Sequence, residues 1–362
     1  MSKFHSLVVK EVRKETEDTV SVLFDVPDSL QSEFTFIQGQ YLTLNTEIDG
    51  AEVRRSYSIC SGPTDGELRV AIKKIEGGLF STFANEVLQA GDRLEVMTPM
   101  GNFYTELNAS NEKHYVAFVS GSGITPVLSI VKAVMASEPN SRFTLFYGNK
   151  TKNSIIFKET LEGIKNDYMN RFSLYHILSR EVVESEVFSG RITPEKCEDF
   201  QGFALDFDKA DEFFLCGPEA MIMSVSDYLK GRGIDQKKIH FELFTTAAAQ
   251  SKSDVVLTED EVLSNKDQSA SQIELIIDGI NYEFPLAEDG PTILDAAMAV
   301  GADVPYACKG AVCCTCKARV TEGKVKMDAN YALEEDEIER GFVLSCQAHP
   351  ITEKVVIDFD EL

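Results

Sequence analysis

The sequence has no long hydrophobic run and comparatively few basic residues. No apolar stretch reaches the roughly 18 residues that a membrane-spanning helix needs, and the opening residues, MSKFHSLVVK, lack the apolar segment and cleavage site of a signal peptide. The 35 Lys and Arg are outnumbered by 59 Asp and Glu, and the net charge of −24 disfavours nucleic acid and membranes as partners. We therefore expect a cytoplasmic protein, in which cysteines serve as metal ligands or core residues rather than disulfides.

The length and composition are those of a globular protein with several domains. The 362 residues suffice for two or three domains, and 43% hydrophobic with 26% charged residues excludes disordered, collagen-like and coiled-coil proteins. We find no arrangement of serine or cysteine with a base that is typical of a nucleophilic enzyme.

Four of the eight cysteines lie within nine residues, in CKGAVCCTC. Cys308, Cys313 and Cys316 have the C-x4-C-x2-C spacing of plant-type [2Fe–2S] proteins, and Cys346 supplies a distant fourth thiol. Small residues in this loop let backbone N–H groups point at the cluster sulfurs. Cys314 is out of register and is expected to be a neighbour. The alternative, a structural zinc site, would favour a second C-x2-C pair, and only one fits here.

The residues around this loop follow the order of a β-grasp ferredoxin. Residues 273–286 predict a strand, an Asp-Gly turn and a second strand, and 293–302 have helical apolar spacing that ends at Gly301. This order resembles the [2Fe–2S] ferredoxins over residues 273–362, which carry 18 acidic and 7 basic residues. The acidic run 334–339 is either a solvated helix face or a docking surface for a basic redox partner.

The first motifs of the chain suggest phosphate and flavin binding. In the sequence Arg55-Ser56-Tyr57-Ser58, arginine can pair with a phosphate and tyrosine can lie on a flavin ring. Gly78 precedes a predicted helix that Phe80 and Ser81 open, and a helix N-terminus offers free N–H groups to a pyrophosphate. Each motif is also compatible with an ordinary barrel strand or turn.

From residue 113 onward, predicted strands alternate with helices. A buried strand at 114–120 leads into GSGITP (121–126) and a helix, a turn that binds phosphate in nucleotide-binding folds. The turn lacks the third glycine of the dinucleotide fingerprint. Later strands lead into Cys216-Gly217-Pro218 and finish with HFELF at 240–244.

Together, and in this order, these motifs resemble the ferredoxin–NADP reductase superfamily, and among its members the reductase subunits of di-iron phenylacetyl-CoA epoxidases. The segments RRSYSIC, AIKKIEGGLFS, GSGITPVLSI, VPYACKGAVCCTCKARV and GFVLSCQAHP carry the similarity. The resemblance implies an antiparallel flavin-binding β-barrel at 1–107 and a doubly wound parallel-sheet NAD(P) domain at 113–244. A linker at 245–272 and a β-grasp [2Fe–2S] domain at 273–362 would follow. The G-G-x-x-S turn favours FAD over FMN.

The resemblance also implies roles for individual residues. Ser58 and Cys216 would lie at the hydride-transfer centre, although Cys216 is also compatible with a buried thiol and Phe244 with a core aromatic. The cofactor-binding residues would be Arg55, Tyr57, Ser58, Gly78, Ser81 and Phe244 for the flavin, Gly121, Gly123, Thr125, Pro126 and Arg180 for the nucleotide, and Cys308, Cys313, Cys316 and Cys346 for the cluster.

Coenzyme choice depends on the charges near the ribose. An NAD site places a carboxylate on the 2′-hydroxyl, whereas NADP needs cations. Ser179-Arg180, with Lys150 and Arg191, favours NADPH over NADH. The implied function is an enzyme that passes electrons from NADPH through FAD and the cluster to the oxygenase subunits of a phenylacetyl-CoA epoxidase. The alternatives are the reductase of another oxygenase, a stand-alone NAD(P)H oxidoreductase and a non-enzymatic redox sensor.

Overall fold

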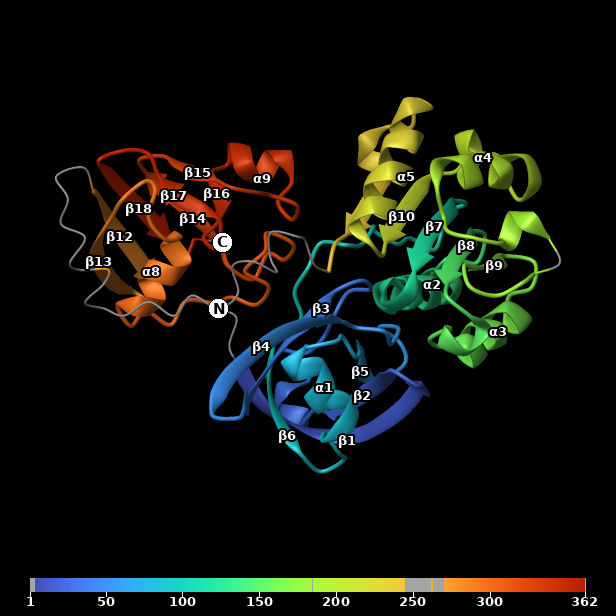
Figure 1. Ribbon diagram of the computed structural model, residues 1–362, viewed down its shortest axis with the longest axis horizontal. Helices are drawn as coiled ribbons and strands as arrows, with labels where there is room; N and C mark the ends of the chain where they lie inside the picture. The colour runs from blue at the N-terminus through green and yellow to red at the C-terminus, as the bar shows by residue number, and fades with distance from the viewer. Residues whose placement is uncertain (1–3, 184, 245–261, 263–269, 362) are drawn as a thin grey trace. The chain divides into compact units, whose positions relative to one another are not determined.

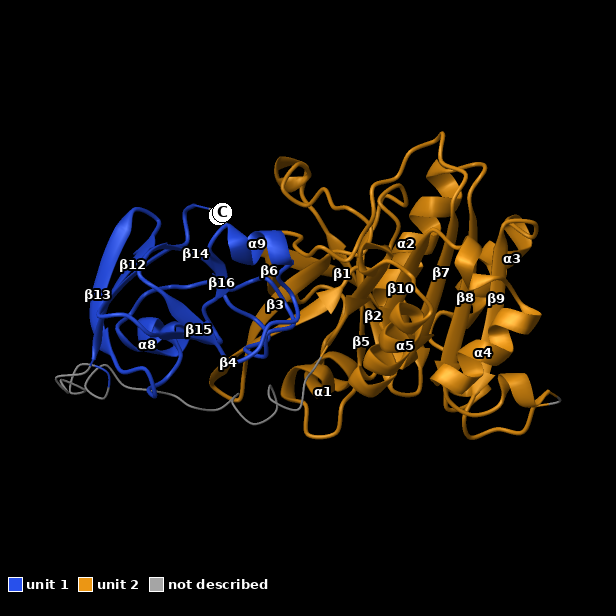
Figure 2. Ribbon diagram, turned by 90° about the horizontal axis from the view of Figure 1, so that it is seen from above, with its two compact units in different colours: residues 1–3, 245–362 blue, residues 4–244 orange. Residues whose placement is uncertain are grey.

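The structure is a computed structural model that describes residues 4–183, 185–244, 262 and 270–361. The chain divides into two compact units, one formed by Phe4–Phe244 and the other by Met1–Lys3 with Thr245–Leu362 (Figure 2). Among the residues described, no helix is long and apolar enough to cross a membrane.

The first part of the larger unit is an antiparallel β-barrel with α1 (Leu79–Glu86) packed against it (Figure 1). A bridge between Ile59, just after β4, and Val70 of β5 joins the two edges of the sheet. Phe80 and Ala84 of α1 belong to the buried barrel core. The strands, in spatial order, are β4 (Ala51–Ser58), β3 (Tyr41–Ile48), β6 (Arg93–Met97), β1 (Phe4–Thr16), β2 (Thr19–Asp25) and β5 (Leu68–Lys73).

The second part of this unit is a parallel sheet whose central strand is β7. From β7 the chain proceeds to β8 and β9 on one side and then returns to β10 and β11 on the other, so the sheet is doubly wound. In spatial order its strands are β11 (Ile239–Glu242), β10 (Glu212–Cys216), β7 (His114–Ser120), β8 (Arg142–Asn149) and β9 (Phe172–Leu178). The helices are α2 (Ile124–Ser137), α3 (Lys158–Asp167), α4 (Pro194–Phe203) and α5 (Glu219–Gly231).

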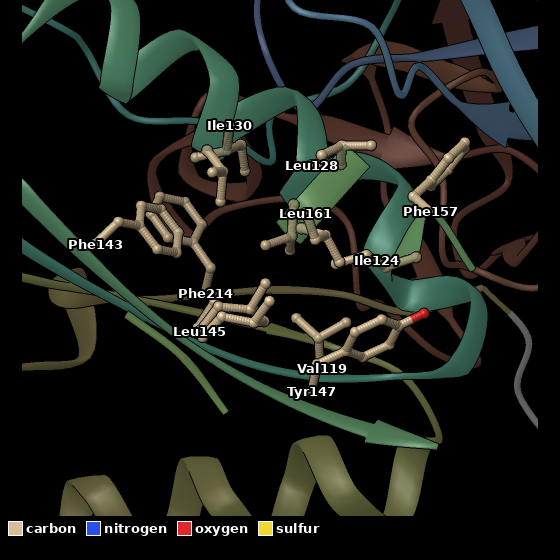
Figure 3. Packing of buried hydrophobic residues seen from close by; sticks show 14 of the residues in the cluster. Val119, Ile124, Leu128, Ile130, Phe143, Leu145, Tyr147, Phe157, Leu161 and Phe214 are labelled. Atoms are coloured by element: carbon tan, nitrogen blue, oxygen red, sulfur yellow. The ribbon is translucent and has the colours of Figure 1, made fainter. Parts of the chain in front are cut away.

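Helices cover both faces of this sheet, which explains why its strands are apolar throughout. One face packs under α2 and α3, with Phe143 and Leu161 in a shared cluster (Figure 3). On the opposite face, Phe146 stacks on Phe118 at 5.1 Å and on Phe200 of α4 at 4.3 Å between ring centroids. The sheet is therefore buried on both faces beneath its connecting loops.

The smaller unit has the β-grasp arrangement expected from the sequence. Its β12–β18 pair is parallel and its other ladders are antiparallel, and α8 packs its apolar side into the core. The spatial order is β13 (Ile280–Leu286), β12 (Ser271–Ile277), β18 (Lys354–Asp358), β14 (Lys317–Glu322) and β16 (Phe342–Leu344), and the remaining elements are β15 (Val325–Met327), β17 (Ala348–Pro350), α8 (Ile293–Ala299) and α9 (Glu335–Glu339). The predicted fold class, a flavin barrel, a doubly wound domain and a ferredoxin domain, is confirmed.

The structure describes two parts of the proposed linker, 245–272, namely residue 262 and residues 270–272. Most of that segment lies outside the described residues. β12 begins at Ser271, which pairs with Leu286 of β13, and the next residue, Gln272, pairs with Lys354 of β18. The apolar pattern of the sequence does not indicate these two pairings. Val262 is only 3% exposed and belongs to the core of the smaller unit. This part of the proposed linker is therefore packed against the ferredoxin fold.

Candidate functional site

The loops after β7 and β10 meet where the strand order of the parallel sheet reverses. This position is the usual ligand crevice of doubly wound folds. A Cβ atom on Gly123 would lie 2.2 Å from the carbonyl oxygen of Cys216, so only glycine allows the two backbones to touch here. Gly217 follows at a φ of 156°. The predicted nucleotide turn and the Cys-Gly-Pro turn thus form one continuous backbone surface.

A buried tyrosine holds the nucleotide turn in place. Tyr147 of β8 donates its hydroxyl to the carbonyl of Gly121 at 3.0 Å, and Figure 3 shows this side chain at the edge of the core. Gly121 has a left-handed φ of 58°, and Thr125 donates to the Ser122 carbonyl at 3.0 Å. Pro126 is buried in the first turn of α2. No sequence motif indicates this contact.

A carboxylate joins the barrel to the parallel sheet at the same place. Ser58, at the end of β4, donates its hydroxyl to Glu242 Oε2 at 3.2 Å. Glu242 is the register partner of Cys216 in the β10–β11 ladder. Burial, and then the negative charge of Glu242, raise the pKa of the Cys216 thiol, so this thiol is neutral. Ser58, Cys216 and Glu242 therefore lie together, and Glu242 was missed although it ends the last strand.

The aromatic and basic residues of the R-x-Y-S motif share one face of β4. Arg55 and Tyr57 are two residues apart in the strand. The Tyr57 ring packs on Phe80 of α1 at 5.5 Å between centroids, and burial raises the Tyr57 pKa. Arg55 is exposed and donates to the Arg54 carbonyl at 2.7 Å. An aromatic surface beside an exposed guanidinium suits a flavin ring and its phosphate.

The glycine turn before α1 is closed by Ser81. The Ser81 hydroxyl accepts a hydrogen bond from the Ile75 N–H at 3.1 Å and donates to the Gly78 carbonyl at 3.3 Å. A Cβ atom on Gly78 would lie 2.5 Å from that hydroxyl oxygen. The serine thus shapes the turn from inside, and contact of its side chain with a flavin phosphate stays a prediction.

The predicted ribose-binding residues lie on neighbouring strand ends. The Arg180 N–H, after β9, donates to the Lys150 carbonyl, after β8, at 2.9 Å. Both side chains are exposed, and within the described residues neither forms an ion pair with a carboxylate. Glu181 instead accepts the Lys152 N–H at 2.7 Å. Phe244 packs partly buried against the core of the parallel sheet.

The four thiols expected to bind the cluster form two pairs. The Cys308 and Cys313 sulfurs are 3.1 Å apart. A hydrogen bond to the Cys346 thiol raises the pKa of Cys316, and the charges of the first pair add to this effect, so all four groups are close. Among the described residues, no group of three or more His, Cys, Asp or Glu is arranged to hold a single metal ion. Two pairs fit a [2Fe–2S] cluster, in which each iron takes two thiolates.

Cys314 points away from these pairs. Its thiol donates to the Ala332 carbonyl at 3.2 Å, and burial raises its pKa to about 12. The loop itself is tightly turned, since Lys309 and Ala311 both have positive φ values, 49° and 63°. The Gly310 N–H donates to the Cys308 sulfur at 3.3 Å, as expected for a loop that directs amides at a cluster.

Comparisons with known proteins agree with this arrangement. Residues 6–104 match the oxidoreductase FAD-binding domain family, 118–227 the oxidoreductase NAD-binding domain family and 275–350 the 2Fe-2S iron-sulfur cluster binding domain family. The chain is 44% identical over 360 residues to one of the subunits of 1,2-phenylacetyl-CoA epoxidase from Escherichia coli (strain K12), with 99% of both chains covered. The chain belongs to the family of FAD-dependent reductases with a C-terminal [2Fe–2S] domain.

One further relative is named as a reductase component of an oxygenase, and one solved structure shares the fold of this chain. The chain is 32% identical to the ferredoxin reductase component of 3-ketosteroid-9-alpha-monooxygenase from Rhodococcus rhodochrous, over 98% of this chain and 96% of that one. The structure of phthalate dioxygenase reductase shares its fold, with a TM-score of 0.58 and 21% identity over 98% of both chains. The predictions of FAD, a pyridine nucleotide, a [2Fe–2S] cluster and an oxygenase reductase component are thus confirmed.

Proposed function

We propose that this reductase transfers electrons from NADPH to the di-iron oxygenase component of a phenylacetyl-CoA epoxidase. The supporting observation is the 44% identity to the Escherichia coli epoxidase component, along 99% of both chains. This similarity therefore includes both the nucleotide domain, where electrons enter in our proposal, and the ferredoxin domain, where they leave. Identity to the 3-ketosteroid monooxygenase component is lower, at 32%.

When bound, FAD supplies the hydride-accepting chemistry and the [2Fe–2S] cluster the one-electron chemistry. In our proposal, the chain positions these groups. The Ser58 hydroxyl and the neutral Cys216 thiol orient the reacting rings, and Glu242 fixes the Ser58 hydroxyl through their hydrogen bond. Tyr57 supports one flavin face and Phe244 covers the other.

The remaining proposed contacts follow the two glycine turns. Arg55 and the α1 turn bind the flavin pyrophosphate, and the close approach at Gly123 gives the coenzyme access to backbone N–H groups. The other proposed binding residues are Gly78, Ser81, Gly121, Thr125 and Pro126, and the proposed cluster ligands are Cys308, Cys313, Cys316 and Cys346.

We propose NADPH rather than NADH as the coenzyme, supported by two exposed cations, Lys150 and Arg180, on adjacent strand ends. Arg180→Ala should raise the NADPH KM at least about tenfold, a loss of about 1.4 kcal/mol of charge-assisted binding, and should leave the NADH KM nearly unchanged. Lys209→Ala is the control, since Lys209 is 74% exposed and pairs with Asp206 elsewhere. Equal changes in both KM values would contradict the assignment.

The acceptor is tested by mixing the purified reductase with the oxygenase subunits of a phenylacetyl-CoA epoxidase. We expect NADPH oxidation and product formation to require both the oxygenase and phenylacetyl-CoA. Mixing with the oxygenase of 3-ketosteroid-9-alpha-monooxygenase is the control. If FAD and the cluster are reduced by NADPH but the epoxidase stays inactive, the electron acceptor is another oxygenase.

A further inference from the structure

Gln347 is a buried polar residue directly after the proposed ligand Cys346. Only 2% of its surface is exposed. Its backbone is held on both sides, because its N–H donates to the Leu344 carbonyl at 2.9 Å and its carbonyl accepts the Asp328 N–H at 3.0 Å. The direction of its side chain is therefore determined by the fold around it.

The side-chain amide of Gln347 has acceptors in both cysteine segments. Its Nε2 lies 2.7 Å from the Cys346 carbonyl oxygen, 3.2 Å from the Lys309 carbonyl oxygen and 3.6 Å from the Cys346 sulfur. The amide nitrogen carries two hydrogens, which these three acceptors share. Lys309 follows the ligand Cys308 and has a left-handed φ of 49°. One amide thus joins the segment carrying the first thiol to the segment carrying the last.

We propose that Gln347 is a positioning residue that sets the redox potential of the cluster, by donating to the Cys346 sulfur and by holding the Lys309 turn against it. The inference rests on the proposed function, since it takes Cys346 as a ligand. A donor to a ligand sulfur stabilises the reduced cluster more than the oxidised one, because reduction adds a negative charge. Removing this donor therefore makes the cluster harder to reduce.

The first test is Gln347→Leu, which keeps the apolar bulk and removes the donor, beside Gln272→Leu on the exposed side of β12 as a control. Iron per chain, flavin reduction by NADPH, the cluster midpoint potential and the EPR spectrum of the reduced cluster are measured. We expect two irons per chain and normal flavin reduction. At a fixed potential, the ratio of reduced to oxidised cluster should fall up to about tenfold, which is about 59 mV for a one-electron couple.

A second measurement uses the native protein and does not depend on the variant binding iron. Glutamine labelled with 15N in its side-chain amide should give a hyperfine coupling to the reduced cluster in pulsed EPR. A fully loaded Gln347→Leu protein with an unchanged potential, or a native protein with no such coupling, would overturn the inference alone. Absence of a two-iron signal from native protein would instead overturn the cluster assignment and the proposed function.

Discussion

Replacing Gly123 by alanine tests whether contact between the two loops positions the hydride-transfer site. The new Cβ would lie 2.2 Å from the Cys216 carbonyl oxygen and 2.9 Å from the Gly217 nitrogen, both backbone atoms. Gly123 itself has an ordinary φ of −58°, so the substitution adds a clash and no conformational strain. Restoring a contact of about 3.4 Å requires the loops to separate by about 1 Å.

A displacement of about 1 Å at a reacting centre costs about 10²-fold in rate. We therefore expect Gly123→Ala to slow FAD reduction by NADPH about 10²-fold in anaerobic stopped-flow measurements. Gly163→Ala is the matched control, since Gly163 lies in α3 with nothing within 4 Å of a new Cβ. This control should reduce FAD normally and gain about 0.5–1 kcal/mol of stability. A correctly folded Gly123→Ala protein that reduces FAD within about threefold of the native rate would refute the reasoning.

Three further predictions concern ionisable side chains. Glu242→Gln should slow FAD reduction by about tenfold to 10²-fold, with little change in NADPH affinity, because it weakens a charge-assisted hydrogen bond to Ser58. An unchanged rate would show that Glu242 does not contribute to FAD reduction. Glu335→Gln with Asp336→Asn should slow electron transfer to the oxygenase at low salt and have no effect at high salt. Burial lowers the His114 pKa to about 4, so the unfolded chain binds a proton that the folded protein does not. The melting temperature should therefore fall as the pH is lowered from about 6.5 to 4, and this fall should be smaller in His114→Gln.

The acidic run near the cluster is part structural and part available for docking. Glu337 is buried, accepts the Glu334 N–H at 3.0 Å and pairs with Lys317 at 3.1 Å. Its charge therefore stabilises α9 and the loop before it. Glu335 and Asp336 are exposed on the same short helix. For this reason the charge substitutions above use these two residues and leave Glu337 in place.

Local patterns predicted the parts of the site that depend on short stretches of chain. The cysteine spacing, the Asp-Gly hairpin and the strand-to-glycine turns are all local, and each is present in the structure. Gly123 could be selected from sequence because its turn has a known spacing after a buried strand. In these cases the backbone geometry that the function requires is encoded within about ten residues.

The contacts that sequence analysis missed join distant segments. Ser58 and Glu242 are 184 positions apart, and no local pattern indicates that the barrel delivers one to the other. Tyr147 lies in an apolar strand and has the pattern of a core residue, yet its hydroxyl supports Gly121. Ser81 was selected for its place at the start of a helix, and its hydroxyl also closes the turn before that helix through contacts with Ile75 and Gly78, which the sequence does not indicate. These roles depend on tertiary packing.

The division of the chain also separates the residues proposed for the two kinds of electron transfer. All proposed flavin and nucleotide contacts come from Phe4–Phe244, and all four proposed thiolate ligands come from the smaller unit. Each unit has its own buried core, and Cys316 and Cys346 belong to the core of the smaller one. Because no ligand is shared, a change at the cluster should alter its potential without altering hydride transfer. Conversely, a substitution at Gly123 should slow hydride transfer without altering the potential of the cluster. Reduction of a dye by the flavin and one-electron reduction through the cluster therefore test separate sets of residues.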